Sequence, residues 1–93
     1  MIAGMTDTDD PIYAVIQAHR AAAAAFGTTP SDHAAAAEFA ALDRLARTEP
    51  RTIAGVIALL GYTQDFAHSD LPDGFDRELR RSLLRALTRI CQA

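Results

Sequence analysis

The chain has 93 residues, of which 49% are hydrophobic and 23% are charged, so it is long enough for one small domain and too apolar for wholesale disorder. Twenty residues are alanine, all nine basic residues are arginine, and lysine and asparagine are absent. Because alanine adds little volume, we expect a thin core. The net charge of −3 argues against a dedicated nucleic-acid binder, and the single cysteine, Cys91, excludes an intramolecular disulfide.

The first nine residues are acidic and carry neither the basic region nor the apolar stretch of a signal peptide. We expect residues 1–9 to be disordered and residues 10–93 to form a single helical domain. No segment approaches the roughly 18 continuous apolar residues that a membrane-spanning helix needs. The expected location is the cytoplasm, with no membrane association.

A first helix is predicted from Asp10 and Pro11, because aspartate caps the first free amides and proline is favoured at the first helical position. The helix is expected to end near Gly27, a residue type common at helix ends. Its apolar stripe consists of Ile12, Val15, Ile16, His19, Ala23 and Phe26.

A second helix follows the turn at 28–30, with Ser31 or Asp32 as its cap, and continues to about Arg47. Because the connection is short, the two helices should form an antiparallel hairpin. The alanine runs in both helices favour helix formation and let the two backbones approach closely. The second apolar stripe consists of Ala35, Phe39, Leu42, Leu45 and Ala46.

The third predicted helix, from Ile53 to about Ala67 with Thr48 or Thr52 as its cap, is the most apolar part of the chain. It carries two apolar stripes that together cover more than half of its circumference. A helix of this kind is either central in its own bundle or shared with a partner. One stripe consists of Ile53, Val56, Ile57 and Leu60, and the other of Leu59, Tyr62 and Phe66.

The last predicted helix runs from about Phe75 to Cys91. Its apolar face consists of Phe75, Leu79, Leu83, Ala86, Leu87 and Ile90. Since no segment shows the alternation typical of strands, the predicted class is all-α: an antiparallel helical hairpin plus two further helices, packed as a small up-and-down bundle.

His19 lies in the middle of the first apolar stripe, and a buried imidazole needs a partner. The hairpin register brings His19 and Arg20 level with Glu38, so Glu38 is the candidate partner. Two interpretations stay open: a structural core histidine with its acid, or a catalytic or ligand-binding group formed by His19, Arg20 and Glu38.

Other chemistry has little support in the sequence. There is no CxxC, HxxxH or HExxH pattern for a metal, no glycine-rich phosphate loop and no GxSxG nucleophile motif. We therefore expect no metal, no cofactor and no enzymatic activity.

A row of arginines at four-residue spacing follows one side of the last helix, opposite its leucines. Like charges at this spacing repel, so acidic groups elsewhere should offset them. The acidic N-terminal half, including Asp43 and Glu49, is the nearest source, either within the chain or from a second copy. The row consists of Arg77, Arg81, Arg85 and Arg89.

Thr52 and Gly55 open the third helix, where the threonine can cap it and the glycine can admit another helix at close range, or the free amides can bind an anion. Together with the runs Asp10–Arg20 and Leu79–Leu87, the segment Ala46–Tyr62 resembles short, uncharacterised, all-helical proteins of alphaproteobacteria. Those proteins read DPI…I…HR, then TxPxTxAGxxALLxY, then a leucine-rich helix. The resemblance implies a helical fold and brings no activity.

The functional prediction is a non-catalytic interaction or structural module that self-associates. Leu59, Tyr62 and Phe66 are expected to bury against a second copy, with Leu84 joining that surface. The alternative is a small regulatory protein whose arginine row binds an acidic protein or, less favoured, a nucleic-acid backbone.

Overall fold

The computed structural model describes residues 9–66 and 71–92, which form four α-helices: α1 (Pro11–Thr28), α2 (Asp32–Arg47), α3 (Ile53–Gln64) and α4 (Phe75–Gln92). Within these ranges no strand is present, so the predicted all-α class is confirmed. Residues 1–8 of the segment expected to be disordered lie outside the described residues, as do Ala67 and His68.

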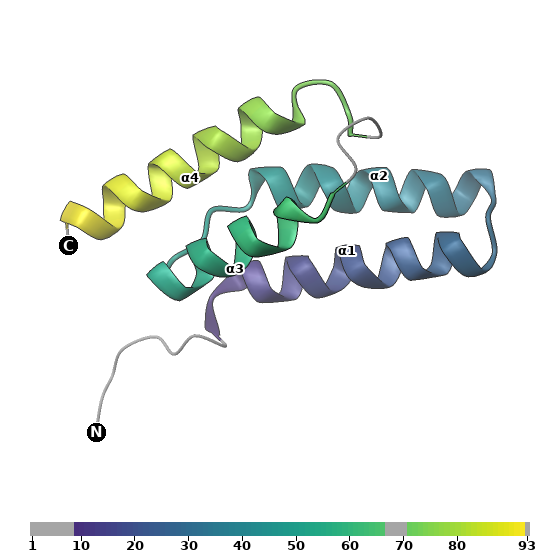
Figure 1. Cartoon of the computed structure of the whole chain (residues 1–93), viewed down its shortest axis with the longest axis horizontal. Coiled ribbons are helices and arrows are strands. Elements are labelled where there is room, and N and C mark those ends of the chain that lie inside the picture. The colour runs from purple at the N-terminus through teal and green to yellow at the C-terminus, as the bar shows by residue number, and fades with distance from the viewer. Residues whose placement is uncertain (1–8, 67–70, 93) are drawn as a thin grey trace.

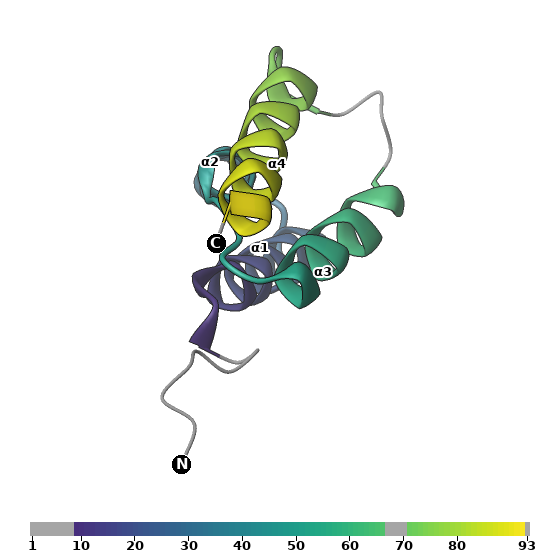
Figure 2. The same ribbon diagram turned by 90° about the vertical axis from the view of Figure 1, so that its left-hand side faces the viewer.

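Consecutive helices alternate in direction, as expected for an up-and-down bundle (Figure 1). The most extensive packing joins α1 and α2, which form the predicted hairpin. α3 packs on α1, while α4 packs on α2 and on α3. The α3–α4 pair therefore forms a second layer against the hairpin, as Figures 1 and 2 show together.

Side chains at the helix starts explain where the helices begin. Ser31 caps α2 by accepting a hydrogen bond from the amide of Ala34 at 3.0 Å, and Thr52 caps α3 by accepting one from Gly55 at 2.9 Å. α1 ends at Thr28, close to the expected end near Gly27, but its C-cap is Thr29 rather than Gly27. The last turn is closed instead by the Thr28 hydroxyl, which donates to the Ala24 carbonyl.

The hydrophobic core occupies the part of the molecule where α1 begins and α2 ends. The fully or nearly buried apolar side chains come from all four helices: Ile12, Val15, Ile16, Leu42, Leu45, Ala46, Val56, Leu59, Phe75, Leu79 and Ala86. The alanine-rich end of the hairpin projects beyond the second layer (Figure 1). No helix among the described residues has the length and apolar character needed to cross a membrane.

Asp10 joins the start of α1 to the start of α3. Its side chain is 1% exposed, and its Oδ1 accepts from the amide of Ile12 at 3.1 Å. Its Oδ2 accepts from the amides of Arg51 at 2.8 Å and Thr52 at 2.9 Å and from the Thr52 hydroxyl at 2.8 Å. Gly55 is buried against this carboxylate. The sequence left open whether the start of α3 admits a close neighbour at Gly55 or binds an anion at its free amides. Both descriptions apply, because the close neighbour is the Asp10 carboxylate, an anion of the same chain.

This junction fixes the rotation of α3 and corrects the interpretation of its two stripes. Because Gly55 must face Asp10, the residues one and two turns later on that side, Leu59 and Tyr62, also face inward. Leu59 is 0% exposed and belongs to the chain's own core, so its assignment to an interface is wrong. In the stripe expected to be internal, Val56 alone is buried, whereas Ile57 is 64% exposed.

Candidate functional site

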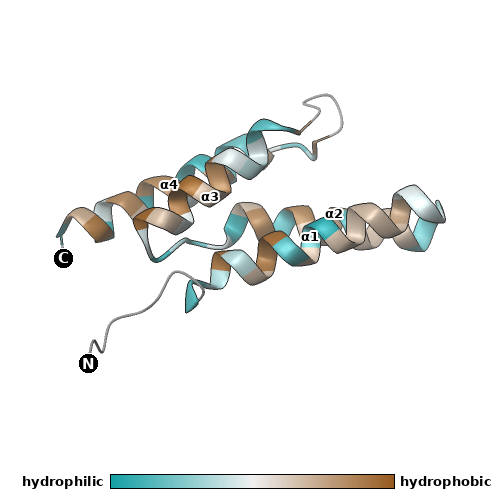
Figure 3. Cartoon of the chain, turned by 60° about the horizontal axis from the view of Figure 1, so that its bottom comes forward, coloured by the Kyte–Doolittle hydropathy of each residue, from teal (hydrophilic) through white to brown (hydrophobic). Residues whose placement is uncertain are grey.

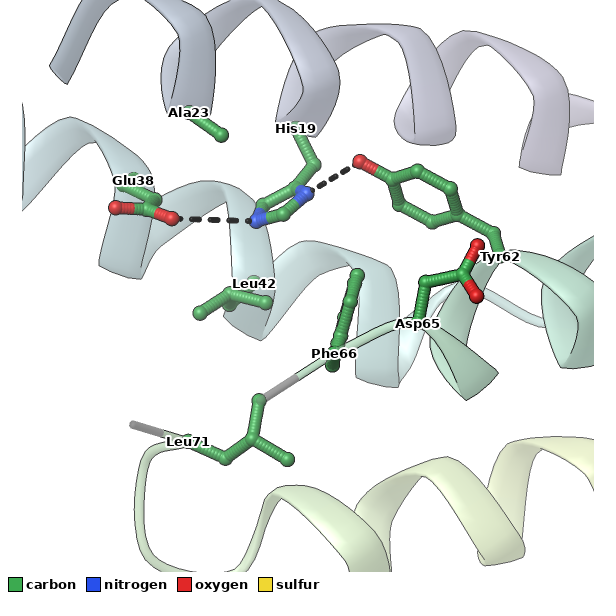
Figure 4. A pocket seen from close by; sticks show the side chains of 8 residues that line it. All are labelled: His19, Ala23, Glu38, Leu42, Tyr62, Asp65, Phe66 and Leu71. Carbon is green, nitrogen blue, oxygen red and sulfur yellow. Dashed lines mark hydrogen bonds and ion pairs between the residues drawn. The ribbon is translucent and has the colours of Figure 1, made fainter. Parts of the chain in front are cut away.

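His19 is the one histidine in the described core, with 5% of its surface exposed. It follows Ile12, Val15 and Ile16 on the inward face of α1, which places its ring between α2 and α3. Nδ1 lies 2.7 Å from the Tyr62 hydroxyl, and Nε2 lies 3.8 Å from Oε2 of Glu38 (Figure 4). The first contact is a hydrogen bond, and the second is too long for one.

His19 and Glu38 thus lie close together, as predicted, but the hydrogen-bond partner of His19 is Tyr62 from α3. Arg20 does not join the pair. Its guanidinium carbon lies 5.1 Å from the centroid of the Tyr62 ring, in the geometry of a cation–π contact. Tyr62 lies seven residues after Gly55 on the same side of α3, so its inward position follows only once Gly55 is known to face α1.

Burial sets the protonation of this group. Loss of solvent lowers the pKa of His19 below its ordinary value, although the Glu38 carboxylate raises it in part. The imidazole is therefore neutral at pH 7. Loss of solvent also raises the pKa of the Tyr62 hydroxyl, against a lowering by the Arg20 charge, so the phenol keeps its proton. Tyr62 can then donate to Nδ1 or accept from it, depending on the histidine tautomer.

A cavity of about 360 Å³ opens beside His19. Its polar lining comes from His19, Glu38, Tyr62 and Asp65, as the close view in Figure 4 shows. The apolar lining consists of Ala23, Leu42, Phe66 and Leu71. Phe66 lies with its ring centroid 5.2 Å from that of His19, so one wall is aromatic. A cavity with one apolar wall and a few convergent polar groups is typical of a small-molecule site.

Three members of the arginine row of α4, Arg81, Arg85 and Arg89, meet acidic groups of the same chain. Glu49, which precedes α3, forms ion pairs with Arg85 at 3.9 Å and with Arg89. Arg81 lies 3.7 Å from Glu78 one turn earlier. The expectation that the acidic N-terminal half offsets the row is confirmed for Glu49. Asp43, another of the candidate acids, instead pairs with Arg47 on its own helix. Since the arginine side chains are about 60% exposed, these pairs stabilise the fold only slightly.

A second surface feature consists of large aliphatic side chains that the fold leaves exposed on α3 and α4: Ile53 at 48%, Ile57 at 64%, Leu60 at 46%, Leu84 at 67% and Leu87 at 39%. α3 is mostly hydrophobic, apart from its hydrophilic last turn (Figure 3). Leu84 was expected at such a surface, whereas Leu87 was expected in the core. Tyr62 and Phe66 are half-buried and pack on the core instead.

Metal-binding residue types do not converge within the described ranges: no group of three or more His, Cys, Asp or Glu side chains there has an arrangement that could hold a metal ion. Cys91 is an exposed free thiol near the end of α4. Comparison with protein-family models, with curated proteins and with solved structures finds no match to this chain.

Proposed function

We propose that this protein is a non-catalytic interaction module that forms a homodimer through the outer face of α3 and α4. The observation that carries the proposal is the exposure of five large aliphatic side chains on two adjacent helices. We call this surface the α3–α4 outer face: Ile53, Ile57, Leu60, Leu84 and Leu87. An apolar surface of this kind on a small protein is typical of an interaction site.

The rotation of the two helices explains why these side chains lie outside the core. On α3, Gly55 faces α1, so Val56, about 100° further round the helix, faces α4. Ile53 and Leu60 lie one turn either side of Val56, at the edge of that contact. On α4, Ser82 faces α2 through a hydrogen bond, and at about 100° per residue Leu84 and Leu87 lie about 200° and about 140° round the helix from it, so both point away from α2.

A second copy of the chain is the partner that this face fits best. α3 itself contains no charged residue, so the part of the face that this helix contributes is uncharged. The two ends of α3 carry opposite charges, since Arg51 lies two residues before its first residue and Asp65 directly after its last. Two copies of α3 packed antiparallel about a two-fold axis would therefore bring each Arg51 to the Asp65 of the other copy.

The test is sedimentation equilibrium under reducing conditions, so that a disulfide through Cys91 cannot mimic a dimer. We expect a mass of twice the 10.0 kDa of the chain. Burying the exposed two-thirds of Ile57 contributes about 1–2 kcal/mol in each copy, so Ile57→Glu should weaken the dimer roughly 30- to 1,000-fold. Leu84→Glu should act similarly.

Phe39→Glu is the matched control, because Phe39 is also a large exposed apolar side chain, at 52%, but lies on α2. This variant should remain dimeric. A wild-type chain that stays at the mass of one copy at tens of micromolar contradicts the proposal. So does a Phe39→Glu variant that dissociates as readily as Ile57→Glu.

A further inference from the structure

We propose that the cavity beside His19 binds a small primary ammonium ion with an apolar body, such as an arylalkylamine, and that the ammonium group lies between His19 Nε2 and the Glu38 carboxylate. The site lies on the side of α3 that faces α1, away from the α3–α4 outer face. It therefore does not depend on self-association.

The first step of the argument is an unused hydrogen-bonding position. His19 Nε2 is buried and has no hydrogen-bond partner among the residues that the structure describes. Leaving a buried ring nitrogen unpaired costs about 1–3 kcal/mol, so such groups usually serve a purpose. The nearest polar atom is Oε2 of Glu38 at 3.8 Å, which is too far for a direct bond.

The second step is the spacing of these two atoms. An ammonium nitrogen donates at about 2.7–2.9 Å to a carboxylate and at a similar distance to a neutral imidazole. Two acceptors that are 3.8 Å apart can both receive hydrogen bonds from one such nitrogen placed between them. His19 Nε2 and Glu38 Oε2 are thus too far apart to bond to each other, but their separation suits two hydrogen bonds from one shared donor.

The third step is that Tyr62 lets the ring change its tautomer. In the tautomer with a proton on Nδ1, that N–H donates to the Tyr62 oxygen over the 2.7 Å contact, and Nε2 presents a lone pair. In the other tautomer the Tyr62 hydroxyl donates to Nδ1, and Nε2 carries the proton. The Tyr62 bond survives in both, so His19 can offer Nε2 as an acceptor when a cation arrives.

The remaining lining sets the charge and shape of the ligand. Glu38 and Asp65 contribute two carboxylates, whereas Arg20 lies on the ring of Tyr62 and does not line the cavity. An anion is therefore repelled, and a cation is attracted. Phe66 and Leu42 supply an apolar wall for a hydrocarbon or aromatic body. The volume of about 360 Å³ is at the small end of the range of ligand pockets, about 300–1,000 Å³.

The experiment compares three probes of one shape by titration calorimetry: 2-phenylethylamine, 2-phenylethanol and 3-phenylpropionate. We expect the amine to bind, the alcohol to bind at least tenfold more weakly and the anion not to bind. Glu38→Gln should lower the affinity for the amine at least tenfold, because it removes the carboxylate. Asp32→Asn, which neutralises an exposed acid on the same helix, should leave the affinity unchanged.

Nitrogen NMR of the histidine rings gives an independent readout. On binding the amine, His19 Nε2 should show the shift of an unprotonated ring nitrogen, while Tyr62 remains bonded to Nδ1. The proposal is overturned if the amine does not bind at millimolar concentration, if the alcohol binds equally well, or if Glu38→Gln binds as tightly as wild type. Glu38→Gln should leave the dimer mass unchanged, and Ile57→Glu should leave amine binding unchanged, so this site and the dimer can fail separately.

Discussion

Replacing glycine by alanine in α3 is expected to have opposite effects at two positions of the same helix. Alanine favours a helical backbone over glycine by about 0.5–1 kcal/mol. Gly61 is exposed, and an added methyl group there meets nothing within 4 Å. Gly61→Ala should therefore stabilise the protein by about that amount.

Gly55→Ala should instead destabilise the protein. A Cβ atom at this position would overlap Oδ2 of Asp10 and lie 2.9 Å from its Cγ and 3.1 Å from Cγ2 of Ile12. The carboxylate can withdraw only by weakening its bonds from the α3 start, and one hydrogen bond to a charged group contributes about 1.5–3 kcal/mol. Added to an overpacking cost of about 1–3 kcal/mol, this loss exceeds the helical gain of at most about 1 kcal/mol. We expect a net loss of roughly 2–4 kcal/mol.

Thermal and urea unfolding, followed by circular dichroism, measures both effects. Since about 1 kcal/mol shifts the Tm of a domain of this size by roughly 4–8 °C, the two variants should differ by more than about 10 °C. Asp10→Ser supplies the control, because serine still caps α1 but is shorter. In that background Gly55→Ala should cost less than about 1 kcal/mol. Equal stability of the Gly55→Ala and Gly61→Ala proteins would refute the idea that Asp10 sets the rotation of α3.

Three further predictions concern polar groups of the core. Tyr62→Phe should cost about 1–3 kcal/mol in urea unfolding, because it leaves His19 Nδ1 buried and unpaired; an unchanged midpoint would contradict this bond. Because burial lowers the pKa of His19 below its unfolded value of 6.5, the unfolded chain takes up a proton that the folded chain does not. The contribution of His19 to stability is therefore complete above pH 6.5 and declines as the pH falls below it, and His19→Gln should reduce this slope in unfolding measured from pH 7.5 to 5. Ser82→Ala should lower the free energy of unfolding by about 1–3 kcal/mol, because the buried Ser82 hydroxyl donates at 2.6 Å to the carbonyl of Ala46 near the end of α2. Arg85→Ala should lower it by less than about 1 kcal/mol, because the ion pair of Arg85 is exposed. A larger loss for Arg85→Ala than for Ser82→Ala would reverse that ranking.

The residues at which the first three helices begin could be predicted from local sequence signals. The rotation of α3 about its own axis could not. Asp10, Ser31 and Thr52 cap helices through amides two or three residues away, so the sequence around each one carries the information. The rotation of α3 depends on a bond from Arg51 to Asp10, 41 residues earlier. The helix has apolar residues on two sides, so its pattern alone favours neither.

The same long-range dependence explains what was missed at the candidate site. His19 and Glu38 face each other because the hairpin register follows from a short turn, which the sequence shows. Tyr62 reaches His19 only because α3 presents that side to α1. The exposed position of Ile57 has the same cause.

The projecting end of the hairpin has a consequence for how the molecule opens. There α1 and α2 have each other and no second layer, and all nine alanines of 21–25 and 34–37 are exposed or half-buried. Backbone amides in this region are protected by helix propensity and one helix–helix contact, so they open at a fraction of the global unfolding free energy. Hydrogen exchange should therefore begin at the hairpin turn and progress toward Leu45 and Ile12, which exchange last. The four-helix core is thus expected to stay folded while the projecting end of the α1–α2 hairpin opens locally.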